Sequence, residues 1–186
     1  AQFRVALKSG PIAYVVPDRE LPLVNISVLV RVGDYLDPEG KEGLAKLTGY
    51  MLTRGGTQSK SAEELEEQVA FLAANLISGT SDSQGTVNLN LLSKDLDEGL
   101  AILREVLSAP RFQADKVALR KQQMLQAMKQ RNDDSSNIEQ REASFLAYGE
   151  SFSVNRYATA ASLEAITADD IARFHRQWYW PSNFII

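Results

Sequence analysis

The sequence predicts an α+β fold in which an antiparallel β-sheet is packed on one face by α-helices, as a two-layer sandwich. Two observations carry this prediction: strand-like segments follow one another in meander pairs, and helix-like segments come in blocks. The predicted order is β, β, β, α, α, β, β, α, α, α, α, β. The length of 186 residues fits a single domain, since domains average about 150 residues.

Three strands are expected first. Residues 3–7 and 12–16 flank Ser9-Gly10-Pro11, a short Gly-containing turn that predicts a hairpin. Residues 24–32 alternate apolar and polar side chains with a period of two, which is the clearest strand pattern in the chain. The Gly-, Asp- and Pro-containing residues 33–40 then predict a loop.

Helical spacing of apolar residues begins after this loop. Leu44, Leu47, Tyr50 and Met51 recur at helical spacing, and Gly55-Gly56 is expected to close this helix as a C-terminal cap. Ser61 and Glu64 form a capping box for the next helix. The remaining elements are strands at 75–80 and 85–92, helices at 94–108 (with Ser93 as N-cap), 113–131, 136–148 (with a Ser136/Glu139 capping box) and after a Thr167/Asp170 capping box, and a final strand at 183–186.

The composition excludes several classes of protein. A hydrophobic fraction of 44% with 24% charged residues is typical of a globular domain. The net charge of −4 leaves no basic excess to neutralise phosphates, so nucleic-acid binding is not expected. No apolar run reaches the ~18 residues of a membrane span. Without Cys and with a single His, the chain cannot form a thiolate site or a two-imidazole zinc site.

One segment carries a family resemblance. Gly43-Leu44-Ala45-Lys46-Leu47-Thr48-Gly49-Tyr50-Met51, followed by Gly56-Thr57, resembles the zinc helix of the M16 peptidases (the pitrilysin, insulinase and mitochondrial processing peptidase family), whose active members read G-x-A-H-F-x-E-H-M and then G-T. Leu21-Pro22-Leu23-Val24, Asp37-Pro38-Glu39-Gly40, residues 107–112 and residues 174–183 extend the resemblance over nearly the whole chain. It implies an N-terminal-type M16 domain with the M16/LuxS-like sandwich.

The resemblance also implies where a zinc site would lie, and the chain departs from the family pattern at each position. In active members two His at i and i+4 share a helix face and bind zinc, and the Glu before the second His is the general base. Here Lys46 and Tyr50 replace the two His, and Gly49 replaces the Glu. The third ligand, a Glu on a later helix, falls on Ala127, and a supporting Glu falls on Arg120.

We therefore predict a degenerate H-x-x-E-H motif with no catalytic residue, no metal ligand and no cofactor in this chain, because Lys and Arg repel a dication. One interpretation places Lys46 and Arg120 in a polar cluster with Tyr50 and nearby carboxylates; in the other, Lys46 and Tyr50 are ordinary surface or cleft-wall residues. His175 is expected to be a structural histidine with a hydrogen-bonding partner. Met124, Leu125 and Met128 are expected in the core, and residues 178–180 are expected to anchor the last helix to the sheet with one ring exposed.

The resemblance implies a function without chemistry of its own. A non-catalytic M16 domain would pair, as a dimer, with an active zinc-peptidase subunit or homologous domain, enclose a proteolytic chamber and hold peptide substrate; zinc is expected only in that partner. Two alternatives stay open: a structural scaffold of the same fold, and part of a zinc metalloendopeptidase whose active site lies in another domain or chain. Because both ends lie in strand-like runs, we expect a longer chain with a second similar domain after residue 186. A bacterial periplasmic or cell-envelope location is expected.

Overall fold

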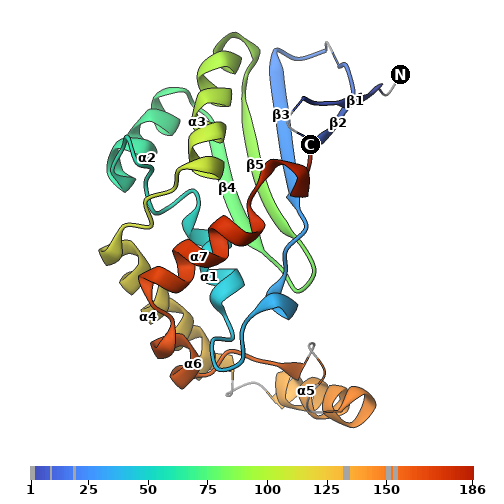
Figure 1. Cartoon of the computed structure of the whole chain (residues 1–186), viewed down its shortest axis with the longest axis vertical. Coiled ribbons are helices and arrows are strands. Elements are labelled where there is room, and N and C mark those ends of the chain that lie inside the picture. Colours follow the sequence, from blue (N-terminus) through green and yellow to red (C-terminus); the bar gives the residue numbers. More distant parts are fainter. Residues whose placement is uncertain (1–2, 9, 19, 132–134, 150–151, 153–154) are drawn as a thin grey trace.

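A computed structural model describes residues 3–8, 10–18, 20–131, 135–149, 152 and 155–186 (Figure 1). Its strands form a six-stranded sheet with the spatial order β1-β2-β6-β3-β5-β4. The strands are β1 (Phe3–Ala6), β2 (Ile12–Val15), β3 (Leu23–Val30), β4 (Asn75–Thr80), β5 (Gly85–Leu92) and β6 (Phe184–Ile185). All neighbours are antiparallel except β2 and β6, which pair in parallel through Ile12 and Ile185. The sheet is mixed at this one pair because β6 is inserted between β2 and β3.

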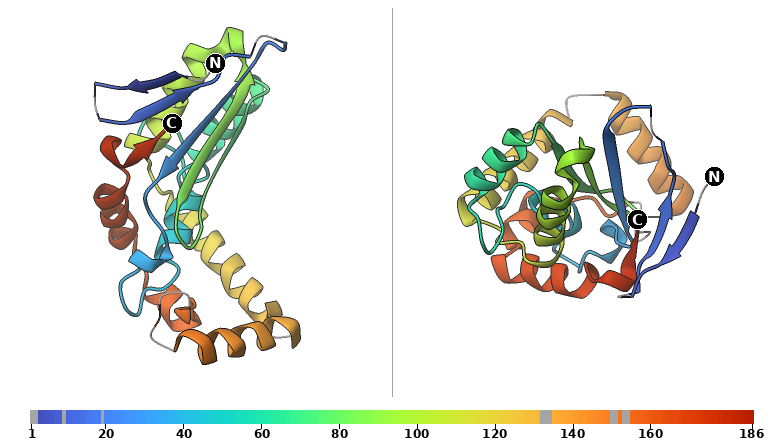
Figure 2. Two further views of the ribbon diagram at one scale, coloured as in Figure 1. Left: turned by 90° about the vertical axis from the view of Figure 1, so that its right-hand side faces the viewer. Right: turned by 90° about the horizontal axis from the view of Figure 1, so that it is seen from above.

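Most of the helices gather on one face of the sheet, so the predicted fold class is confirmed (Figure 2). They are α1 (Leu44–Met51), α2 (Ala62–Phe71), α3 (Leu96–Ser108), α4 (Ala114–Arg131), α5 (Ser135–Tyr148), α6 (Ala160–Ala165) and α7 (Ala168–Trp178). Helix α5 lies at the end of the molecule opposite to the β1–β2 hairpin. Among the residues that the structure describes, no helix combines the length and apolar character needed to cross a bilayer.

Alternation along the long strands explains this one-sided packing. On β5, Val87, Leu89 and Leu91 are at most 1% exposed and join the core with apolar side chains of α1 and α3. The residues between them on β5, and Asn25 and Ser27 on β3, point to the other face and are polar or half-exposed. A sheet with one apolar face can bury only that face against helices.

Of the helix N-terminal capping residues predicted from the sequence, most that the structure describes form the expected hydrogen bonds. The Ser61/Glu64 and Thr167/Asp170 capping boxes both form, each with its two reciprocal hydrogen bonds. The prediction for Ser93 was wrong: Ser93–Asp95 is a turn of 3₁₀ helix, and α3 begins at Leu96 without a side-chain cap. Helix α5 begins at Ser135, and the Ser136/Glu139 box lies outside the described side chains.

Helix α6 was missed from the sequence. Its capping box uses Thr159 and Ser162, and the side chain of Ser162 accepts from the Thr159 backbone N–H at 2.8 Å. The sequence pattern requires Glu or Gln at the third helical position. A serine in that place makes the same contact but gives no recognisable signal.

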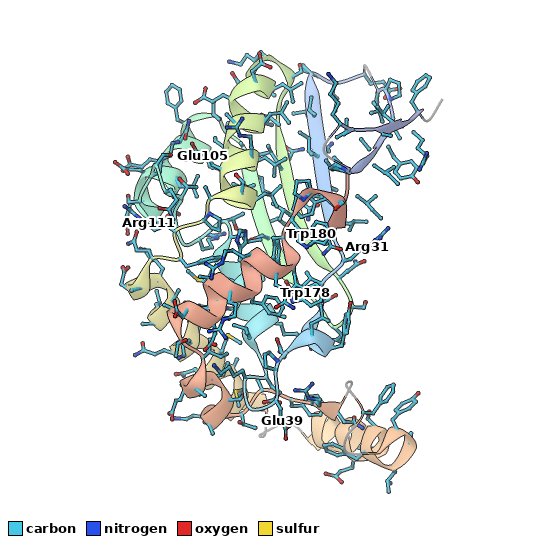
Figure 3. The ribbon with its side chains drawn as sticks, viewed as in Figure 1. Arg31, Glu39, Glu105, Arg111, Trp178 and Trp180 are labelled. Atoms are coloured by element: carbon cyan, nitrogen blue, oxygen red, sulfur yellow. The ribbon has the colours of Figure 1, made fainter. Side chains whose placement is uncertain are left out.

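The predicted structural residues lie where expected. His175 is 7% exposed and its Nε2 lies 2.9 Å from the Leu107 carbonyl oxygen; burial lowers the pKa of this imidazole. Met124, Leu125 and Met128 pack against the core. Figure 3 shows Trp178 and Trp180 at the C-terminal end of α7; Tyr179 between them is buried, and Trp180 is the exposed ring, at 48%.

Candidate functional site

Helix α1 carries three of the positions singled out in the sequence, and a buried carboxylate holds its N-terminus. Asp37 accepts hydrogen bonds from the backbone N–H of Gly43 and of Ala45, each at 2.7 Å. These bonds satisfy amides that a helix start otherwise leaves without partners. Burial raises the pKa of Asp37 to about 6, although the two backbone bonds act to lower it. The loop at residues 33–40 therefore sets the position of α1.

Lys46 is held between two carboxylates. Its Nζ lies 2.7 Å from Oδ2 of Asp34 and 3.1 Å from Oδ1 of Asp82, and the side chain is 46% exposed. Partial burial lowers the pKa of Lys46, but the hydrogen bonds and charges of Asp34 and Asp82 outweigh burial and raise it. The same ammonium lowers the pKa of Asp82. Lys46 thus connects α1 to the loop before it and to the β4–β5 turn as a fixed cation.

Gly49 lies where α1 presses against β4. A Cβ atom at this position would overlap Oγ1 of Thr80 and would lie 2.9 Å from the backbone nitrogen of Thr80. The hydroxyl of Ser78 donates to the Gly49 carbonyl oxygen at 2.6 Å. Helix and strand are therefore too close for any side chain at position 49.

Tyr50 and Arg120 are in contact with each other. The guanidinium carbon of Arg120 lies 3.9 Å from the centroid of the Tyr50 ring, in a cation–π arrangement. Arg120 Nη1 also donates to Oε1 of Gln123 at 3.3 Å. Ala127 is exposed further along α4 and offers no polar side-chain atom. The five positions thus divide into a Lys46 ion-pair cluster, the Tyr50–Arg120 pair, and two positions without functional groups.

These residues do not fit a zinc ion. The groups at the five positions are an ammonium, a bare backbone, a phenol, a guanidinium and a methyl group, whereas zinc needs imidazole, thiolate or carboxylate ligands. Within the described ranges, no three His, Cys, Asp or Glu side chains are placed to hold a metal ion. No step of metal chemistry can be assigned to this arrangement of side chains.

A cavity of about 340 Å³ opens beside the Tyr50–Arg120 pair, between α1, α2, β4 and α4. Sequence reasoning did not find it. Two of its cationic lining residues, Lys116 and Arg120, are four positions apart on α4 and so share a helix face, but nothing in the sequence indicates that Arg54, which follows α1, meets them. The sequence also predicted carboxylate partners for Lys46 but did not indicate that they would be Asp34 and Asp82.

Comparisons with known proteins agree with the resemblance seen in the sequence. The family model described as Insulinase (Peptidase family M16) matches residues 15–150. A relative from Helicobacter pylori named Non-peptidase homolog YmxG is 30% identical over 158 residues, which is 81% of this chain and 35% of the relative. An uncharacterized zinc protease from Rickettsia bellii is 20% identical over 170 residues, 89% of this chain and 41% of the relative. The chain therefore spans well under half the length of both.

Solved structures share the fold. The peptidase M16 inactive domain from Pseudomonas fluorescens superposes with a TM-score of 0.90 at 24% identity, over 100% of this chain and 45% of that one. The periplasmic protease PqqL from Escherichia coli superposes with a TM-score of 0.85 at 14% identity, over 99% of this chain and 20% of that one. With the family model covering most of the sequence, the chain belongs to the insulinase family of peptidases, M16.

Proposed function

We propose that this chain is a non-catalytic M16 domain, which pairs with an active zinc-containing M16 domain or subunit, closes a proteolytic chamber and holds peptide inside it. One observation carries the proposal: the side chains on the helix that resembles the zinc helix cannot bind zinc. We take Lys46, Gly49 and Tyr50 as the positions of the degenerate H-x-x-E-H motif on α1. On α4, Ala127 is taken as the position of the third zinc ligand and Arg120 as that of the supporting Glu.

The cations make this loss of chemistry hard to reverse. Lys46 is bound by Asp34 and Asp82, so these two carboxylates are occupied. Arg120 places a permanent positive charge on the Tyr50 ring. A divalent cation brought between them would meet repulsion that only a strong ligand set could offset. A glutamate at position 49, the general-base position, would collide with β4.

The lengths and names of the relatives support a partner domain. One is named a non-peptidase homolog and another a peptidase M16 inactive domain, and this chain spans 35% and 45% of their lengths. The active half would lie in another domain or in a second chain. Because PqqL is a periplasmic protease, we also propose a bacterial periplasmic location.

Peptide would be held by strand addition at β4. This strand ends the sheet, with β5 as its strand partner on one side. Its sequence, Asn75–Thr80, contains no charge and no proline, the features by which natural edge strands avoid pairing. A peptide added here would gain main-chain hydrogen bonds without a demand on its sequence. Six residues of strand can pair about 20 Å of extended peptide.

Zinc binding gives the first test. The purified protein is incubated with excess zinc, separated from free metal by gel filtration and analysed for zinc. We expect none above the buffer blank. The triple variant Lys46→His, Tyr50→His and Ala127→Glu is the matched positive control, because it restores two imidazoles at i and i+4 and the third ligand position on α4. Stoichiometric zinc on the unaltered chain would contradict the proposal.

Hydrogen exchange gives the second test. The protein is mixed with an M16 protein from the same source that carries H-x-x-E-H, and the complex is exposed to an extended peptide. We expect a defined complex in sedimentation and slowed amide exchange in β4. The same peptide N-methylated at alternate amides should give no protection, since it cannot pair as a strand. Complex formation without protection anywhere in the cleft would favour the structural scaffold instead.

A further inference from the structure

The cavity between α1, α2, β4 and α4 has a polar, cationic side and an apolar side. Its accessible apolar lining includes Val69, which is partly buried, and Leu119, which is 51% exposed; Met51, Leu65 and Leu76 also belong to the lining but are at most 7% exposed. Its volume, about 340 Å³, lies within the range of small-molecule sites in proteins. An apolar group of the size of one aliphatic side chain can therefore be covered here.

The charges at the cavity favour an anion. Arg54, Lys116 and Arg120 line it, against the single carboxylate of Glu66. Lys116 is neutralised by Glu63, whose Oε1 lies 2.6 Å from its Nζ. Arg54 and Arg120 have no carboxylate within ion-pair distance in the described part of the chain. The cavity therefore has a local excess of guanidinium groups without a carboxylate partner, in a chain of net charge −4.

Arg120 is oriented but incompletely satisfied. Its ring contact with Tyr50 and its bond to Gln123 fix the plane of the guanidinium. Its Nε is buried and finds no acceptor among the described residues. A planar guanidinium matches a carboxylate with two parallel bonds. The arrangement is suited to a ligand that supplies carboxylate oxygens.

The position of the cavity relates it to the edge strand. Asn75 and Leu76, the first two residues of β4, belong to its lining. A peptide that adds antiparallel to β4 runs toward the beginning of that strand, so its C-terminal end arrives at the cavity. We propose that this cavity binds the C-terminal residue of an extended peptide, with the apolar side chain against Val69 and Leu119 and the α-carboxylate on Arg120 and Arg54. That the ligand is a peptide rests on the proposed peptide-holding function; the carboxylate site itself does not.

The cavity is tested without any peptide or partner. N-acetyl-L-leucine and N-acetyl-L-leucinamide are titrated into the ¹⁵N-labelled protein, and amide shifts of the lining residues are followed. We expect the acid to bind about tenfold or more tightly than the amide, as for a hydrogen bond to a charged group. Equal affinities, or no saturable shifts with the acid, would overturn the proposal.

Substitutions identify the groups that bind the carboxylate. Arg120→Gln and Arg54→Gln should each weaken binding of the acid and leave the weak binding of the amide unchanged. Arg120→Lys should be intermediate, because it keeps the charge and loses the planar fork. Arg104→Gln, an exposed position on α3 outside the cavity, is the matched control and should have no effect. If neither cavity variant weakens binding while both remain folded by circular dichroism, the assignment is wrong.

A peptide arm separates this proposal from the proposed function. A six-residue peptide ending in leucine is compared as free acid, as C-terminal amide, and as an amide with an internal glutamate. The free acid should bind most tightly and protect β4; equal binding of the glutamate peptide would refute recognition of the C-terminus. If N-acetyl-leucine binds through Arg120 but no peptide protects β4, the cavity stands and strand addition fails.

Discussion

Replacing Gly49 by alanine should destabilise this domain, although alanine is the better helix former. In a helix interior the change from glycine alone would add about 1 kcal/mol of stability. Here the new Cβ would overlap Oγ1 of Thr80 and would lie 2.9 Å from the Thr80 nitrogen and 3.0 Å from the Gly79 carbonyl carbon. Overpacking typically costs about 1–3 kcal/mol, and contact with backbone that cannot move aside places this site at the upper end, so we expect a net loss of about 2 kcal/mol.

Urea unfolding followed by circular dichroism measures this loss as a lower midpoint with an unchanged slope. Gly79→Ala, on the adjoining strand, is the control, because no atom lies within 4 Å of a Cβ placed there. It should raise the free energy of unfolding slightly, by up to about 1 kcal/mol, and should not lower it. In a Thr80→Ala background the cost of Gly49→Ala should fall but not vanish, since only the overlap with the hydroxyl is removed.

A Gly49→Ala protein as stable as the unaltered one, or more stable, would refute the close packing of α1 on β4. It would also remove the reason for which a glutamate cannot occupy this position. If the prediction holds, the family's general base cannot be restored by a single substitution, because any side chain at position 49 must first displace an edge strand.

Three further predictions concern charged groups around α1 and α7. Lys46→Met should lower the free energy of unfolding by less than about 1 kcal/mol, with a smaller loss at high salt, because both ion pairs are partly exposed; a loss that is large and independent of salt would contradict this. Asp37→Asn should cost about 1–3 kcal/mol at neutral pH, because an amide oxygen can satisfy only one of the two N–H groups. The pKa of Asp37 in the folded protein, about 6, lies above its ordinary value of 3.8. Protonation of Asp37 therefore stabilises the fold below pH 4, and this stabilisation is lost as the pH rises through 6. Chemical denaturation across this range should show the fall in the free energy of unfolding in the unaltered protein and not in Asp37→Asn. Burial opposes ionisation of Asp170, but bonds from Lys41 and Thr167 lower its pKa to about 2, so its contribution is complete above pH 4 and is lost toward pH 2; Asp170→Ala should cost about 1–2 kcal/mol at pH 7 and little at pH 2.

Some features follow from interactions between residues close in sequence. Alternation along residues 85–92 is sufficient to place a strand with one buried face. The Ser61/Glu64 box is sufficient to start α2, because both bonds join residues three positions apart. The absence of imidazole and carboxylate groups on α1 is likewise read directly from the sequence, because folding cannot supply a side chain that the helix lacks.

Other features depended on residues brought together from distant segments. The insertion of β6 between β2 and β3 joins the two ends of the chain. Lys46 meets Asp82, 36 positions away, and Arg120 meets Tyr50 from another helix. The closeness of α1 and β4 at Gly49, and the cavity beside them, arise from packing of whole elements. Sequence alone determined which groups are missing from α1; only the tertiary structure decided what the remaining groups contact, because such contacts are set by the geometry of packed helices and strands and not by spacing along the chain.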